Sequence, residues 1–182
     1  MFLPGHFGVG LALKPAAPKL PLWTLLLASE ALDILSFCFV VAGIESMGSY
    51  QIDLGRGLMA ISPESIPWSH GLLMALIWSA IALTLGHLIF KEWRVGAVLG
   101  LAVFSHWALD FIVHASDLPL LIGGSQAVGL GLWSTGAGFI AAMALELALF
   151  GGGLAIYFTW RRGLRSISTQ PVRPERIINV EK

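Results

Sequence analysis

The stretch VGAVLGLAVFSHWALDFIVHASDL, residues 95–118, combines two properties that decide the fold. It is long enough to cross the hydrocarbon core of a bilayer, which takes about 20 residues of α-helix. It also carries His106, Asp110, His114 and Asp117. The first three recur every fourth residue and Asp117 follows three residues later, so a continuous helix places all four in one polar stripe. The stretch therefore predicts a transmembrane helix whose polar face is directed at other helices.

Three more stretches have the length and apolarity of transmembrane helices, namely residues 20–43, 67–90 and 135–160. Of all 182 residues, 56% are apolar and only 12% are charged, far from the composition of soluble domains. Residues 2–13 are apolar but too short to cross, which favours an interfacial or re-entrant segment. We therefore predict an all-α integral membrane protein, with a four-helix bundle in residues 1–165 and a disordered tail in residues 166–182.

The charges are balanced overall but unevenly distributed along the chain. Eleven basic and eleven acidic residues cancel, so no basic excess is available to bind nucleic acid. Apart from Arg56, the basic residues precede the first span, separate the second from the third, or follow the fourth: Lys14, Lys19, Lys91, Arg94, Arg161, Arg162, Arg165, Arg173, Arg176 and Lys182. By the positive-inside rule, both termini are cytoplasmic. We expect a bacterial inner membrane protein in contact with membrane lipid.

Ionisable residues inside the spans need a partner or a purpose, because each costs about 2.5–3.5 kcal/mol at a helix centre. At about 1.5 Å of rise per residue, several lie about 18–24 Å from the cytoplasmic ends of their helices. These are Asp33, His106, Asp110 and Glu146. They can therefore meet at one level. His70 and His114 lie nearer the outer boundary, which predicts a polar pocket that opens to the non-cytoplasmic side.

Imidazoles and carboxylates together suit a divalent transition metal, with zinc favoured. We expect His70, His106, Asp110 and His114 to be ligands and Asp33 to be a ligand or a bridging carboxylate. Two further carboxylates, Glu30 and Glu146, are candidates for a general base or for orienting the ligands. The alternative is a set of buried His–carboxylate pairs that only fix the register of the helices.

Four motifs in the chain carry a family resemblance. They are Gly-His-Phe-Gly-Val-Gly at 5–10, Leu-Asp-Ile at 32–34, Trp-Ser-His-Gly-Leu-Leu at 68–73 and Ser-His-Trp-Ala-Leu-Asp at 105–110. Together, over residues 3–160, they resemble the YdjM-like family of membrane-bound metal-dependent hydrolases, in a small four-span branch. The resemblance implies that the metal positions are held by His6, Asp33, His70, His106 and Asp110.

The chain departs from this family in its first span. Many members have Pro-Asp-x-Asp-His there, whereas this chain has Leu-Asp-Ile-Leu-Ser at 32–36, without the second Asp and the His. Glu30, one turn before Asp33, or Glu146 of the fourth span are the residues that would compensate.

The first hypothesis for function is a metal-dependent hydrolase that acts on a lipid-like or amphiphilic ester or phosphoester. A proton- or metal-ion-translocating protein is the second, although residues 95–104 offer no polar step towards the cytoplasm. A non-catalytic scaffold with internally paired polar residues is the third. One conflict concerns His6, which charge bias places on the cytoplasmic side. It joins the site only if a re-entrant helix starting near Lys14 carries it about 12 Å into the membrane.

Overall fold

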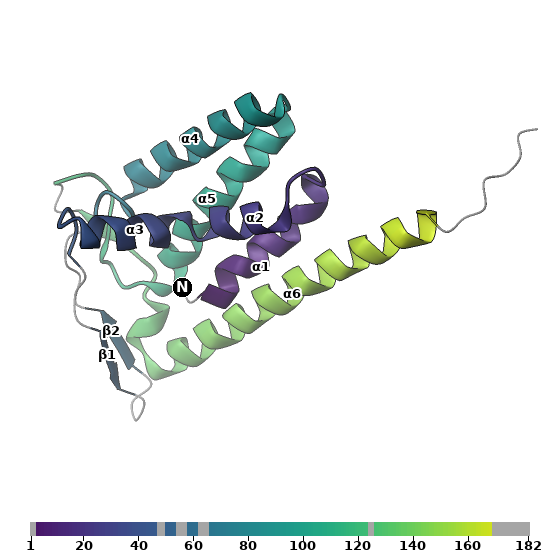
Figure 1. Cartoon of the computed structure of the whole chain (residues 1–182). Coiled ribbons are helices and arrows are strands. Elements are labelled where there is room, and N and C mark those ends of the chain that lie inside the picture. The colour runs from purple at the N-terminus through teal and green to yellow at the C-terminus, as the bar shows by residue number, and fades with distance from the viewer. Residues whose placement is uncertain (1–2, 47–49, 54–57, 62–65, 124–125, 169–182) are drawn as a thin grey trace, which may run out of the picture.

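The computed structural model describes residues 3–46, 50–53, 58–61, 66–123 and 126–168, and most of them are helical (Figure 1). The helices are α1 (Leu3–Leu13), α2 (Leu22–Ser29), α3 (Ala31–Val41), α4 (Leu72–Phe90), α5 (Trp93–Val113) and α6 (Gly136–Ser168), with 3₁₀ turns η1 (Lys14–Ala16) and η2 (Leu132–Ser134). Two short antiparallel strand pairs, which the sequence did not predict, join β1 (Tyr50–Asp53) to β2 (Leu58–Ile61) and β3 (Leu118–Pro119) to β4 (Ala127–Val128).

Within the part of the chain that the structure describes, three helices are long and apolar enough to cross a membrane: α4, α5 and residues Gly136–Arg165 of α6. They indicate an integral membrane protein. The first predicted span is not one straight helix, because α2 and α3 meet at an angle of 60°. Only the two helices taken together have the length and apolarity needed to cross a membrane. The bend lies at Glu30, next to the Ser29 carbonyl that His106 Nδ1 approaches at 2.8 Å. A side chain inserted into the helical hydrogen-bond ladder is a known cause of such kinks.

Glycines allow two pairs of helices to approach closely. Between α4 and α5, a Cβ on Gly96 would lie 2.3 Å from the Leu83 carbonyl oxygen. Between α1 and α6, a Cβ on Gly153 would lie 2.1 Å from the Gly8 carbonyl oxygen, whereas Gly152 faces open space. The α1–α6 contact presses the short N-terminal helix against the long C-terminal one.

The N-terminal helix folds inward. In Figure 1, α1 lies between α6 on one side and α2 and α5 on the other, and the structure has it in contact with all three. Gly5, His6, Gly8 and Gly10 of this helix are buried, and the His6 side chain is fully inaccessible. Packing on three sides explains how a segment too short to cross a bilayer reaches the interior of the protein.

The third span ends earlier than predicted. Helix α5 stops at Val113, and His114 has φ −66° and ψ 147°, an extended conformation that turns the chain away. The expectation of one continuous stripe is therefore wrong beyond Asp110, because His114 and Asp117 lie outside the helix. At the other end of the chain, α6 includes residues 166–168, which we expected to begin the disordered tail. The remainder of that tail, residues 169–182, lies outside the described residues.

Candidate metal centre

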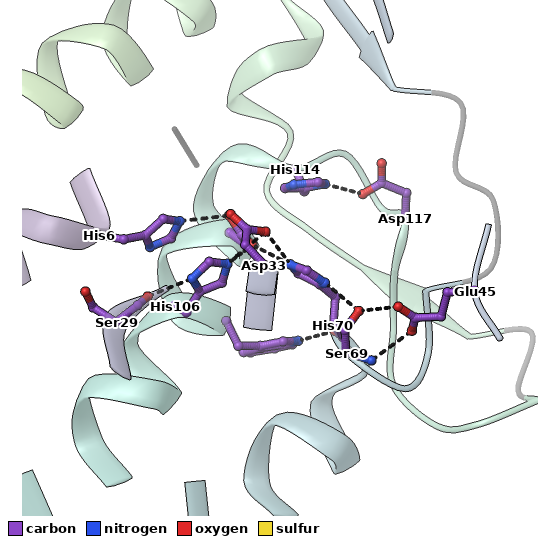
Figure 2. A network of polar contacts seen from close by, with 11 residues as sticks. His6, Ser29, Asp33, Glu45, Ser69, His70, His106, His114 and Asp117 are labelled. Carbon is purple, nitrogen blue, oxygen red and sulfur yellow. Dashed lines mark hydrogen bonds and ion pairs between the residues drawn. The ribbon is translucent and has the colours of Figure 1, made fainter. Parts of the chain in front are cut away.

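Five side chains from four segments come together, and we call them the His/Asp cluster (Figure 2). They are His6 of α1, Asp33 of α3, His70 of the turn before α4, and His106 and Asp110 of α5. They form two overlapping groups that could hold a metal ion, one with His6, His106 and Asp110 and the other with Asp33, His70 and His106. Within each group, the potential ligand atoms lie within 4.8 Å of one another.

Four contacts in the cluster join two Nε2 atoms to two carboxylates. His70 Nε2 lies 3.2 Å from Asp33 Oδ1 and 3.5 Å from Asp110 Oδ2. His106 Nε2 lies 3.5 Å from Asp33 Oδ1 and 3.3 Å from Asp110 Oδ2. Tetrahedral zinc, with bonds of about 2.0–2.1 Å, places neighbouring ligand atoms about 3.3–3.4 Å apart. Each of these four distances is therefore that expected between two neighbouring ligand atoms of one zinc ion.

The tautomer of His106 is fixed by the backbone. Its Nδ1 lies 2.8 Å from the Ser29 carbonyl oxygen, which can only accept a hydrogen bond, so Nδ1 carries the proton. In the neutral ring, Nε2 then has a free lone pair, and it has no hydrogen-bond partner among the described residues. That lone pair faces the Asp33 and Asp110 carboxylates.

The tautomer of His70 is fixed by a relay that the sequence analysis missed. Glu45 is 5% exposed and accepts hydrogen bonds from the Ser69 hydroxyl at 2.7 Å and from the Trp68 and Ser69 backbone N–H groups at 2.8 Å each. The single hydroxyl proton of Ser69 goes to Glu45, so Ser69 Oγ must accept the His70 Nδ1 proton at 2.8 Å. In a neutral ring, His70 Nε2 then presents a lone pair to Asp33 Oδ1 at 3.2 Å, and this contact is a hydrogen bond when the ring is protonated.

Glu45 was overlooked because it lies just beyond the predicted end of the first span, in a connection that has no motif. The available signal was an acidic residue directly after an apolar run. Its three accepted hydrogen bonds tie the end of the α3 segment to the turn that carries His70.

His6 of α1 completes the cluster. Its ring stacks on His106, with centroids 3.8 Å apart and planes 7° from parallel. Its Nε2 lies 3.6 Å from Asp110 Oδ1, and neither ring nitrogen has a hydrogen-bond partner among the described residues. The structure thus brings His6 to the same site as His70, which resolves the conflict over its position.

The cluster can hold a divalent cation for a simple electrostatic reason. Two neutral imidazoles direct lone pairs at carboxylate oxygens at 3.2–3.5 Å, which is repulsive unless a proton or a metal ion lies between them. The side chains of His106 and His70 are only 0% and 6% exposed, so these contacts lie inside the protein. Neutral imidazole nitrogens with compensating carboxylates are the donors that zinc and similar ions bind.

Two glutamates flank the cluster. Glu30 is 4% exposed at the α2–α3 bend, and both its carboxylate oxygens lack a hydrogen-bond partner among the described residues. Glu146 of α6 is 3% exposed and accepts a 2.8 Å hydrogen bond from the Gly5 backbone N–H, next to His6. Both predicted catalytic candidates are therefore buried beside the cluster, outside the two metal-ligand groups.

His114, also predicted as a ligand, lies outside both groups. Figure 2 shows it apart from the cluster, with its Nδ1 3.2 Å from Asp117 Oδ1. Its ring packs on Trp133 with centroids 4.9 Å apart. Burial lowers the pKa of His114 despite the opposing effect of Asp117, so the ring is neutral near pH 7.

One member of the cluster reaches the surface of the protein. The Asp33 side chain is 48% exposed, whereas His6, His70, His106 and Asp110 are nearly or fully buried. Its neighbours Ile34 and Phe37 on α3 are exposed apolar residues, 44% and 67% accessible. The approach to the cluster at Asp33 is thus bordered by an apolar surface.

Comparison of the chain with protein-family models, curated proteins and solved structures gave no match in any of the three.

Proposed function

We propose that the chain is a membrane-embedded, metal-dependent hydrolase that acts on a lipid-like or amphiphilic ester or phosphoester. In this proposal the bent pair α2–α3 counts as one span, which gives a four-span bundle with α1 as a re-entrant helix. The distribution of basic residues supports cytoplasmic termini in a bacterial inner membrane. The four motifs at 5–10, 32–34, 68–73 and 105–110 support membership of the YdjM-like family.

The proposal rests on one observation, namely that Nε2 of His70 and Nε2 of His106 each present a lone pair. Each ring has its Nδ1 proton committed to an acceptor, which leaves Nε2 facing the carboxylates of Asp33 and Asp110. We assign these four residues as metal ligands and His6 as a fifth donor. A divalent metal, zinc by preference, would supply Lewis-acid polarisation of the scissile group and acidify a coordinated water.

The chain's own residues supply the remaining roles. Glu30 has unpaired oxygens in the buried bend and is our candidate for the general base. Glu146 holds the Gly5 backbone N–H and thereby orients the turn that carries His6. The Glu45–Ser69 relay holds the His70 ring in the required tautomer.

Exposure of Asp33 supports an amphiphilic substrate. A polar headgroup could reach Asp33 while its acyl chain lies on Ile34 and Phe37, which face the lipid in this arrangement. Translocation has less support, because the buried α5 residues between the cluster and its basic end are apolar: Val95, Val98, Leu99, Ala102 and Val103. A scaffold of paired residues accounts for the contact of His70 with Asp33, but not for His106 Nε2, which has no hydrogen-bond partner among the described residues.

The test is turnover by the purified, zinc-loaded chain in detergent. We would offer a long-chain p-nitrophenyl ester and a p-nitrophenyl phosphodiester, and compare wild type with Glu30→Gln. The expected result is zinc-dependent release of nitrophenol that falls about 10²–10⁴-fold in the variant while its zinc content is unchanged. Fully loaded protein without turnover of either ester class would contradict the hydrolase assignment. Equal turnover in Glu30→Gln would remove Glu30 as the base.

A further inference from the structure

A second site lies at the opposite end of the molecule from the strand pairs, between η1 and the C-terminal part of α6. A cavity of about 450 Å³ is lined there by Lys14, Tyr157, Trp160, Arg161, Leu164 and Arg165. The cavity is more open than enclosed, and Arg161, Leu164 and Arg165 on its α6 wall are exposed. The α6 residues recur with helical spacing, so one face of this helix forms one wall and Lys14 lies opposite.

Lys14 is a cation that the fold buries without an acidic partner among the described residues. It is 8% exposed, and its ammonium donates to the carbonyl oxygens of Pro18, at 2.8 Å, and Leu20. It also lies 5.4 Å from the centre of the Trp160 ring. Desolvation lowers the pKa of Lys14 because burial penalises the charged form. An anion in the cavity would offset this penalty.

Arg161 presents a second cation to the same cavity. Its guanidinium lies 5.7 Å from the centre of the Tyr157 ring, and its Nη1 donates to the Tyr157 hydroxyl at 3.4 Å. These contacts hold the guanidinium in place, and it has no acidic partner among the described residues. A planar guanidinium beside an ammonium is a suitable pair of donors for the two non-bridging oxygens of a phosphodiester.

The position of the cavity identifies the source of the phosphodiester. Figure 1 places the α1–α2 connection, the α4–α5 connection and the C-terminal part of α6 at this end, and Lys19 of the first pairs with Glu92 of the second. The described basic residues lie in or beside these three segments, and the positive-inside rule therefore places this end at the cytoplasmic leaflet: Lys14, Lys19, Lys91, Arg94, Arg161, Arg162 and Arg165. Trp160 and Tyr157 are residues typical of the headgroup level, and Leu164 is a 49% exposed apolar side chain beside them. Basic pockets between helices on this side of a membrane bind anionic headgroups.

We propose that this cavity binds the phosphodiester headgroup of an anionic phospholipid, with Lys14 and Arg161 as its principal ligands. The bound lipid bridges η1 to α6 and so secures the helix that carries His6. The proposal does not depend on the metal centre or on hydrolysis.

Native mass spectrometry of the full chain in detergent with added dioleoyl phosphatidylglycerol or phosphatidylcholine tests the proposal. The matched control is Arg162→Gln, which removes the same charge from α6 one residue outside the cavity lining. We expect phosphatidylglycerol to bind more tightly than phosphatidylcholine. Lys14→Gln and Arg161→Gln should each weaken phosphatidylglycerol binding about fivefold, while Arg162→Gln and the charge-preserving Lys14→Arg should not.

Two results would overturn the proposal. An equal loss in Arg162→Gln and Arg161→Gln would mean that only diffuse charge attracts the lipid. Displacement of phosphatidylglycerol by millimolar inorganic phosphate would assign the cavity to a free anion. Unchanged zinc content in all the variants would keep this test separate from that of the metal centre.

Discussion

Two His–Asp pairs lie close together in the chain and differ in their surroundings. His106 and Asp110 lie inside α5, where α1, α3 and the turn before α4 add His6, Asp33 and His70 around them. His114 and Asp117 lie just past the helix end, with each other as partners and Trp133 against the imidazole ring. The difference shows that spacing along the chain predicts a pair, whereas a metal centre requires donors from other segments.

The largest predicted effect separates the two aspartates. Asp110→Asn should reduce bound zinc from about one ion per chain to background, because it removes the carboxylate that faces three imidazoles. Asp117→Asn should leave zinc content unchanged. Elemental analysis of both variants, purified in detergent, provides the measurement. Equal loss in the two would show that the pairs are not functionally distinct.

A second prediction concerns the contact between α1 and α6 that places His6 in the cluster. Gly153→Ala places a Cβ 2.1 Å from the Gly8 carbonyl oxygen, so α1 must shift away from α6. This shift moves His6 away from the other members of the cluster. We expect zinc affinity to fall at least about tenfold, as measured by competition with a chelator. Gly152→Ala, where nothing lies within 4 Å of the added Cβ, is the matched control and should bind normally. Wild-type affinity in Gly153→Ala would show that His6 is not a ligand.

Loss of the Glu45 carboxylate should have a moderate effect. In wild type the Ser69 hydroxyl donates to the Glu45 carboxylate and therefore accepts from His70 Nδ1. In Glu45→Gln the hydroxyl can donate to His70 Nδ1 instead, so the tautomer of the ring is no longer fixed. Zinc affinity should fall about 10–100-fold, the usual range for outer-shell partners of metal ligands. Glu92→Gln, which removes a carboxylate paired with exposed Lys19, is the control and should change nothing. An unchanged chelator competition curve would leave Glu45 a purely structural role.

The smallest effect is expected at His114. His114→Gln removes one contact to Asp117 and the packing on Trp133, which should lower thermal stability by about 1 kcal/mol. Zinc content should equal that of wild type, because the ring lies outside both ligand groups. A thermal melt and an elemental analysis of the same sample measure both quantities. Loss of zinc would place His114 in the centre after all.

The sequence was informative where periodicity and hydropathy decide the outcome. The three long apolar helices were predicted from length and composition. His106 and Asp110 lie four residues apart, which predicted that they share one face of α5. The estimated depths of Asp33 and Asp110 in the membrane also predicted that the two carboxylates can meet. In the structure both lie within 3.5 Å of His70 Nε2 and His106 Nε2.

What the sequence could not show depends on tertiary contacts. The bend at Glu30 lies where His106 approaches the Ser29 carbonyl, which no local pattern reveals. The inward course of α1 depends on the fit of Gly8 against Gly153, far apart in the chain. Glu45 acquires its role only because the turn with Ser69 folds back onto it.

Anomalous diffraction at the zinc edge, from crystals of the full chain grown with zinc, tests the central claim most directly. The expected result is an anomalous peak between Nε2 of His70 and His106 and the carboxylates of Asp33 and Asp110, with none at His114. A cluster without a peak in zinc-saturated crystals, or a peak at His114 and Asp117 instead, would contradict the assignment of the metal centre.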